Sequence, residues 1–145
     1  MVLPAVPGPM RSSPLRIGRA RDDGNTIAQR LNLKMAGLET PVSGLSGGNA
    51  QKVVIGKWLN TLPSILLMDE PTRGIDIQAK EQIFHLVRDL ARQGMAVLFI
   101  SSEVEEVLYV SDRILIMNHG RITGDMTRES VDLEGLLGLV MEEIQ

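Results

Sequence analysis

The chain has 145 residues, enough for one domain with a core of its own, and 43% of them are apolar. No apolar run approaches the ~20 residues that a membrane-spanning helix needs, which argues for a soluble protein. The absence of cysteine excludes a disulfide framework, and the two histidines, His85 and His119, stand too far apart in sequence to predict a zinc site. Four of the 15 basic residues precede residue 22, which leaves 11 basic against 18 acidic residues, a net charge of −7. This acidic body argues against nucleic-acid binding as the main function.

Residues 1–24 hold four of the seven prolines together with four arginines, and they show no sustained apolar period. We therefore expect a basic, Pro/Arg-rich, disordered arm ahead of a folded domain at residues 25–145. The arm lacks the continuous apolar core of a secretory signal, and its prolines disfavour an amphipathic targeting helix.

Two helices are predicted next. Asn25 can cap the first, whose apolar residues begin at Ile27 and which loosens at Gly37. The second runs from Gly48 to Asn60, and the side chains expected to pack are Val53, Val54, Trp58 and Leu59. In this helix Lys52 is most simply solvated, with nucleotide contact as a second choice.

A strand is predicted from Ser64 to Met68, and a long helix follows Asp76 and ends at Gly94. Its apolar residues recur at helical spacing, at Ile83, Leu86, Val87 and Leu90. The next strand, from Met95 to Ile100, is apolar along its length, as expected of a parallel strand covered on both faces. Strand, helix and strand together predict a βαβ unit with a right-handed crossover.

The C-terminal third predicts a hairpin and a last helix. Residues 113–117 and 121–124 read as two strands around the turn at residues 118–120. A final amphipathic helix would begin at Ser130 or Asp132.

Two short stretches carry the chemistry. In residues 45–52 (Leu-Ser-Gly-Gly-Asn-Ala-Gln-Lys) a serine and two glycines precede a helix, so backbone N–H groups, a hydroxyl and a helix dipole converge where a phosphate could bind. In residues 65–70 an apolar strand ends in Asp69 and Glu70, at the sheet edge where ligands collect in open α/β folds. The two stretches in this order are far more specific than either alone.

Residues 45–52 resemble the signature motif of ATP-binding cassette (ABC) proteins, in the form with Asn after the glycines that sugar importers carry. Residues 65–70 resemble the Walker B strand, and residues 73–76 resemble the D-loop. The resemblance runs from about Leu31 to the C-terminus. Ala50 departs from it, because the sugar-importer form usually has Gln there, and the change removes some hydrogen bonding.

The resemblance implies an α/β fold, namely a partial P-loop NTPase (ABC ATPase) fold. It would contain a mostly parallel sheet with flanking helices and a C-terminal β-hairpin, and its N-terminal P-loop part would be missing. No G-x-x-x-x-G-K-[ST] motif occurs, since none of the four lysines is followed by Ser or Thr. The chain thus resembles the C-terminal half of a nucleotide-binding domain, the second of a duplicated importer ATPase.

Site roles follow from the resemblance. Asp69 would hold Mg²⁺, and Glu70 would orient or deprotonate the attacking water. The signature residues would contact ATP bound by the opposite subunit; they are Ser46, Gly47, Gly48, Asn49 and Gln51. Asp76 in the D-loop would face that subunit, and its alternative role is a helix N-cap.

Ser102 aligns with the family's switch histidine, and the Ser-Ser-Glu form at residues 101–103 resembles the second cassette of sugar-importer ATPases. Ser102 with Glu105 is also an ordinary capping box for a short helix. The residues leave both roles of Ser102 open.

Two functions of different classes are predicted. The first is a truncated ATP-binding subunit of a carbohydrate importer, which shares ATP and Mg²⁺ with a P-loop-bearing nucleotide-binding domain and docks on membrane permease subunits at the cytoplasmic face of the membrane. The second is a non-catalytic fragment or interaction module, which is how we expect the isolated chain to behave. A small α/β regulatory domain with chance similarity is a third and weaker hypothesis.

Overall fold

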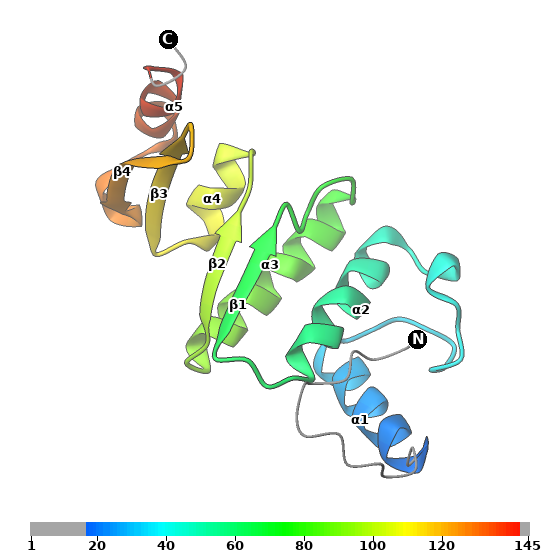
Figure 1. The fold of residues 1–145 in the computed structure, drawn as a ribbon. Coiled ribbons are helices and arrows are strands. Elements are labelled where there is room, and N and C mark those ends of the chain that lie inside the picture. The colour runs from blue at the N-terminus through cyan, green and yellow to red at the C-terminus, as the bar shows by residue number, and fades with distance from the viewer. Residues whose placement is uncertain (1–16, 143–145) are drawn as a thin grey trace.

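The computed structural model describes residues 17–142 (Figure 1). In chain order the elements of this part are α1 (Ile17–Arg30), η1 (Val42–Gly44), α2 (Gly47–Leu59), β1 (Ile65–Asp69), α3 (Ile77–Arg92), β2 (Ala96–Ile100), α4 (Val104–Val110), β3 (Arg113–Asn118), β4 (Arg121–Thr127), η2 (Arg128–Ser130) and α5 (Leu133–Glu142). Within these residues no helix combines the length and the apolar character needed to cross a bilayer. The fold is α/β, as predicted.

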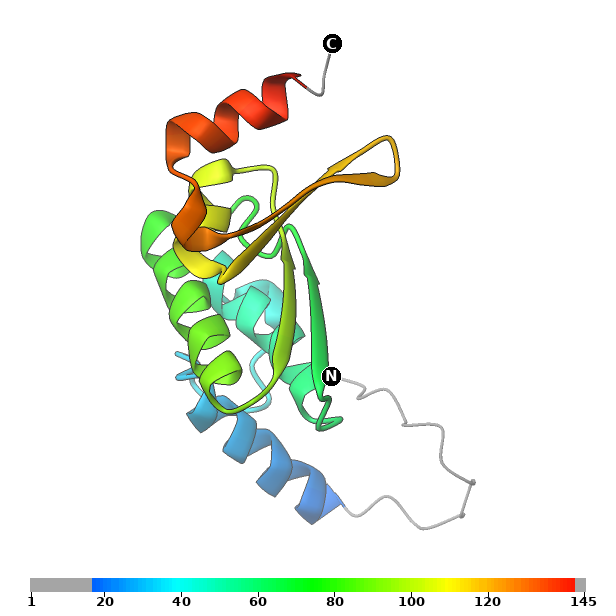
Figure 2. The same ribbon diagram turned by 90° about the vertical axis from the view of Figure 1, so that its left-hand side faces the viewer.

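The centre of the molecule is the β1–α3–β2 unit. The two strands are parallel, and their pairing runs from Ile65 opposite Ala96 to Asp69 opposite Ile100. α3 connects them and lies along one side of the two strands (Figure 2). The predicted strand–helix–strand unit is therefore confirmed, and both strands deliver the residues that follow them to the same edge.

The main core lies between this sheet and the helices α2 and α3. In β1, Leu66 and Met68 are buried at 6% and 5% exposure, whereas their neighbours in the strand are exposed. They meet side chains of the two helices that are almost fully buried, namely Leu59, Ile83 and Leu90. This alternation is the period of two expected of a strand with one covered face.

The opposite face of the sheet is open, which corrects the expectation that the second strand is covered on both faces. Ile65 and Leu67 of β1 are 62% and 69% exposed, and Leu98 and Ile100 of β2 are each 46% exposed. These four residues, hereafter the open face, are apolar on a parallel sheet, a type that normally carries helices on both sides. The described chain supplies a covering layer on one side of the sheet.

α1 begins at Ile17, eight residues before the predicted cap Asn25, which lies inside the helix. Residues 17–24 are thus helical and not part of an arm; residues 1–16 of the predicted arm lie outside the described residues. The physical reason is the position of the prolines. All four of the N-terminal prolines precede residue 15, so none interrupts hydrogen bonding from Ile17 onward.

α2 packs through a different stripe from the one predicted: Gly48, Lys52, Ile55, Gly56 and Leu59. Of the predicted packing residues Leu59 is buried, but Val54 and Trp58 are 48% and 51% exposed. A glycine explains why the packed face of α2 differs from the predicted one. A Cβ at Gly56 would lie 2.6 Å from Ile27 Cγ2, so α1 approaches α2 at this point more closely than a larger residue would allow.

Lys52 is buried at 4% exposure, which corrects the prediction that it is solvated. Its Nζ donates to the carbonyl oxygen of Asn32 at 3.4 Å, between α2 and the end of α1. Desolvation, followed by the charge of Lys34, lowers the pKa of Lys52 below its usual 10.5. Lys52 is therefore committed to helix packing.

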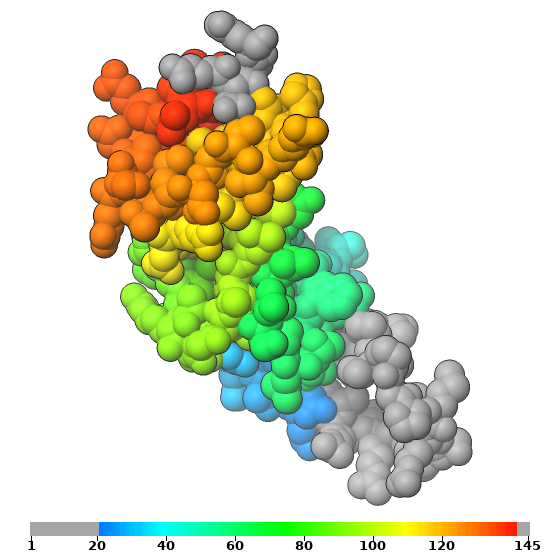
Figure 3. Space-filling view, turned by 60° about the vertical axis from the view of Figure 1, so that its left-hand side comes forward, coloured from blue at the N-terminus to red at the C-terminus, as the bar shows by residue number. Residues whose placement is uncertain are grey.

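The C-terminal third confirms the predicted hairpin and helix. β3 and β4 are antiparallel, and both turn residues, His119 and Gly120, have positive φ, as a tight hairpin requires. β4 continues to Thr127, three residues past its predicted end. The hairpin packs with α4 and α5 around a second core, made of Leu108, Ile114, Ile116 and Leu136. This unit forms one end of the molecule and α1 forms the other (Figure 3).

Candidate functional site

Glu70 and Ser102 meet at the C-terminal edge of the sheet. Glu70 follows β1, and its N–H donates to the carbonyl oxygen of Ile100 at 2.9 Å. Its Oε1 accepts a hydrogen bond from the Ser102 N–H, also at 2.9 Å. Glu70 adopts φ 47°, a strained conformation for a residue with a side chain, which costs about 1–3 kcal/mol. The carboxylate of Glu70 thus contacts the loop after β2.

Ser102 does not form the predicted capping box. The N-cap of α4 is Glu103, and no side-chain hydrogen bond caps this helix. Ser101 takes the local role instead, because its Oγ accepts from the Glu103 N–H at 3.0 Å. Of the two roles left open for Ser102, the capping role is therefore wrong in this structure, and its backbone amide serves Glu70.

The signature serine belongs to a second group of residues. Ser46 occupies the N-cap position of α2 without making a side-chain cap hydrogen bond. Its Oγ accepts from Asn49 Nδ2 at 2.9 Å, and Asn49 Oδ1 accepts from the Lys34 N–H at 3.0 Å. Asn49 thus ties the helix start to the loop after α1. The exposed Ser46 hydroxyl is held at the tip of α2 by this chain of hydrogen bonds.

The two signature glycines let α2 approach the start of α3. A Cβ at Gly48 would lie 2.4 Å from the Cβ of Ala79, and one at Gly47 would lie 3.3 Å from Ile75 Cγ2. Asp76 caps α3, since its Oδ1 accepts from the Ala79 N–H at 2.9 Å. The alternative role of Asp76 as an N-cap is therefore observed. The close approaches at Gly47 and Gly48 place the segment before α3 next to the start of α2.

The predicted site residues therefore fall into two groups, one around Glu70 and one around Ser46. Gln51 lies half-buried on α2 in the second group. Among the described residues, no hydrogen bond joins the two groups. Sequence reasoning missed Glu106 of α4, which is buried beside Ser101. The available signal was its spacing of four from the apolar Val110, which places both residues on the same side of the helix.

Asp69 is the residue that could hold a metal ion. It ends β1 with its side chain exposed, one residue before Glu70. In the described part of the chain no three acidic or histidine side chains gather into a metal site. This arrangement fits Mg²⁺, which commonly takes one or two carboxylates and completes its shell with water and substrate phosphates.

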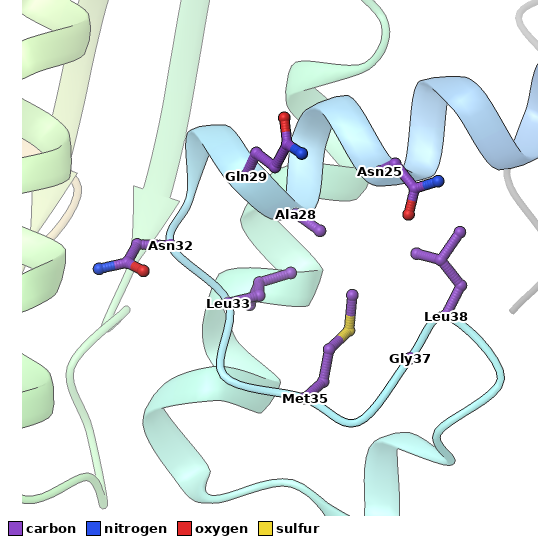
Figure 4. A pocket seen from close by; sticks show the side chains of 8 residues that line it. All are labelled: Asn25, Ala28, Gln29, Asn32, Leu33, Met35, Gly37 and Leu38. Carbon is purple, nitrogen blue, oxygen red and sulfur yellow. The ribbon is translucent and has the colours of Figure 1, made fainter.

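A hollow of about 430 Å³ lies elsewhere, between α1 and the loop that follows it (Figure 4). Its lining combines amide side chains such as Asn25, Gln29 and Asn32 with apolar ones. None of the lining residues is titratable, and none belongs to either group of predicted site residues. We assign it no chemistry.

Sequence comparison connects these features to a family. Residues 13–73 match the family described as ABC transporter. The chain is 50% identical over 115 residues to the uncharacterized ABC transporter ATP-binding protein YphE of Escherichia coli, covering 79% of this chain and 23% of that protein. It is 51% identical over 111 residues to the xylose import ATP-binding protein XylG of Geobacillus kaustophilus, covering 77% of this chain and 22% of XylG.

Structure comparison agrees. The ATP-binding cassette MJ1267 of an ABC transporter superposes with a TM-score of 0.75 at 26% identity, covering 94% of this chain and 53% of MJ1267. In sequence and fold, the chain corresponds to part of an ABC transporter ATP-binding cassette. It spans about a quarter of the length of the curated relatives it matches and about half of the solved cassette.

The ABC match begins at residue 13, ahead of Leu31, where the motifs first suggested it. It therefore includes α1, in agreement with the packing of this helix against α2. The stretches that resemble the Walker B strand, the signature motif and the D-loop all lie within the described residues, in one folded unit.

Proposed function

We propose that this chain supplies the signature segment and the Walker B carboxylates of an ATP-hydrolysing cassette that energises carbohydrate import. The observation that carries the proposal is the strained Glu70 beside the exposed Asp69, with its carboxylate held by the Ser102 N–H at 2.9 Å. Strained backbone of this kind clusters at functional sites. The relationship to XylG supports the sugar class.

Each residue has a distinct role in this proposal. Asp69 binds Mg²⁺, which offsets the charge of the ATP phosphates. Glu70 orients the attacking water and accepts its proton. Ser46 offers its hydroxyl, and Gly47 and Gly48 offer backbone N–H groups at the positive end of α2, to the γ-phosphate of ATP held by an opposing subunit. Asn49 fixes the orientation of Ser46, Gln51 lines the same helix, and Asp76 faces the opposing subunit.

The proposal requires a phosphate-binding loop in addition to these 145 residues, because they contain no such motif. The open face supports this requirement, because its four apolar side chains lie on a parallel sheet to which residues 17–142 add no second helical layer. The partner would be a P-loop-bearing nucleotide-binding domain. The assembled cassette would dock on membrane permease subunits, peripheral to the cytoplasmic face of the membrane.

A non-catalytic interaction module is the second candidate function, and the open face also favours it. A protein with this face exposed can associate through it without any nucleotide chemistry. Activity of the reconstituted cassette separates the two candidates.

The test is ATP hydrolysis by the purified chain, alone and mixed with a P-loop-bearing N-terminal cassette fragment of a sugar-import relative. We expect no turnover by the chain alone and Mg²⁺-dependent turnover by the mixture. In the mixture, Glu70→Gln should abolish turnover and leave ATP bound, because the amide retains the size of the side chain but cannot accept the proton.

Glu105→Gln is the matched control, since Glu105 is an exposed acid on α4 and has no role in the proposal. It should leave turnover unchanged. Ser46→Arg should block the reconstituted site by bulk and charge. Turnover that survives both Glu70→Gln and Ser46→Arg would refute the assigned roles.

A further inference from the structure

A buried carboxylate lies directly behind the Glu70–Ser102 contact. Glu106 of α4 is 5% exposed, and Thr72, two residues after Glu70, is 1% exposed. Glu106 Oε2 accepts from Thr72 Oγ1 at 2.5 Å and from Ser101 Oγ at 2.8 Å. Its Oε1 lies 2.8 Å from Lys80 Nζ in the first turn of α3. One side chain thus contacts the turn after β1, the loop after β2 and the start of α3.

These contacts bracket the Glu70–Ser102 hydrogen bond from both sides. Thr72 fixes the turn that carries Glu70, and Ser101 precedes the amide that Glu70 accepts. Ser101 also accepts from the Glu103 N–H at 3.0 Å, so the loop of residues 101–103 is held at two points. Burying a charge this deeply is costly unless it is paired and hydrogen-bonded. The cost is offset here by three partners from three different segments.

We propose that Glu106 is a positioning residue that sets the place of the Glu70 carboxylate against the loop of residues 101–103. It does so by anchoring Thr72 and Ser101 through one oxygen and Lys80 through the other. The importance of this placement for catalysis rests on the proposed function. The placement itself is a property of the chain alone and can be tested without nucleotide.

The experiment follows the Ser102 amide by ¹⁵N-resolved NMR in the full chain. In the unsubstituted chain the Ser102 amide proton should resonate downfield because it donates to the Glu70 carboxylate, and Glu70→Gln should move that resonance upfield. Ser101→Ala and Glu106→Gln should move it in the same direction and speed Ser102 amide exchange about tenfold or more, as the loss of a hydrogen bond to a charged group predicts. Ser101→Ala is the milder of the two variants and guards against loss of folding in Glu106→Gln.

Two controls separate positioning from general stability. Glu103→Gln removes the Lys80–Glu103 ion pair, whose glutamate is 54% exposed, and should leave the Ser102 proton shift unchanged. Ile114→Val destabilises the second core and should also leave it unchanged. The proposal is overturned if Ser101→Ala and Glu106→Gln leave the Ser102 proton shift and exchange rate unchanged, or if Ile114→Val changes them equally. Failure of the reconstituted ATPase would instead refute the proposed function and leave this result intact.

Discussion

Among single residues, Glu106 stands out because its carboxylate is both buried and ionised. Burial raises the pKa of its carboxyl group, but the ion pair with Lys80 and the hydrogen bonds from Thr72 and Ser101 more than compensate, so its pKa in the folded chain lies below the usual 4.5. The hydrogen bonds from Lys80 to Glu103, followed by its contact with Glu106, raise the pKa of Lys80 above the usual 10.5. Both shifts favour the ion pair at neutral pH.

This shift predicts acid sensitivity. A carboxyl whose folded pKa is depressed stabilises the fold fully above its unfolded pKa of about 4.5, and that contribution is lost as the pH falls through the folded pKa. At pH 7, Glu106→Gln should therefore lower the free energy of unfolding by about 1–3 kcal/mol, and the difference from the unsubstituted chain should shrink as the pH falls below about 4.5. Urea unfolding at a series of pH values measures this difference. A difference independent of pH would contradict the assigned ion pair.

Individual residues also show how much of the candidate site the sequence alone reveals. Asp69, Glu70 and the signature residues form contiguous motifs, so their types and order indicated phosphate chemistry directly. Glu106 is not contiguous with Thr72 or Lys80, and only the tertiary fold brings them together. Ser102 was identified by alignment, but its contact with Glu70 uses the backbone N–H, a group that every residue except proline offers.

At the scale of elements, local patterns predicted the helices after the first, the four strands and the hairpin. The apolar period fixed α3, and a turn compatible with positive φ fixed the hairpin. The predicted contact face of α2 was wrong, because glycines and Lys52 lie at the interface in place of the expected valines and tryptophan. A pattern of apolar residues does not reveal a glycine that lies at a helix interface, because such a glycine contributes no apolar side chain and only permits the close approach of the two helices.

Close approach at the α2–α3 interface gives a prediction of sign. In an isolated helix, Gly→Ala is stabilising by about 1 kcal/mol. At Gly48 the new Cβ would lie 2.4 Å from Ala79 Cβ, so Gly48→Ala should instead destabilise the fold by about 1–3 kcal/mol. Gly44→Ala is the control, because a Cβ at Gly44 would meet no atom within 4 Å and the change should be nearly neutral. Thermal unfolding compares the two; a stabilised Gly48→Ala variant would contradict the packing.

At the scale of the whole molecule, the open face is the feature that distinguishes this chain from a closed α/β domain. The sequence predicted two apolar parallel strands, which is correct, but their composition anticipates the second covering layer that the described chain does not supply. Exposed apolar strand residues also favour self-association. The open face therefore ties the stability of the chain in solution to the partner that the proposed function requires.

Two neighbouring leucines on β1 test this view, because alternate residues of a strand point to opposite faces. Leu66 is 6% exposed in the core and Leu67 is 69% exposed on the open face. Leu66→Ala should cost about 2–5 kcal/mol of unfolding free energy, whereas Leu67→Ala should change it by no more than about 0.5 kcal/mol. Urea unfolding separates the two effects.

The Leu67→Arg variant tests whether the open face takes part in assembly. It should leave the isolated chain folded and reduce its self-association in sedimentation experiments, since the new charge stays in water on the open face. Mixed with the P-loop-bearing fragment, the same variant should fail to restore ATP turnover, because docking would bury an unpaired charge against apolar side chains. Met141→Arg, the same kind of change at a 65% exposed position of α5 away from the open face, should preserve both assembly and turnover. Full turnover by Leu67→Arg would show that the P-loop-bearing partner binds elsewhere on the molecule.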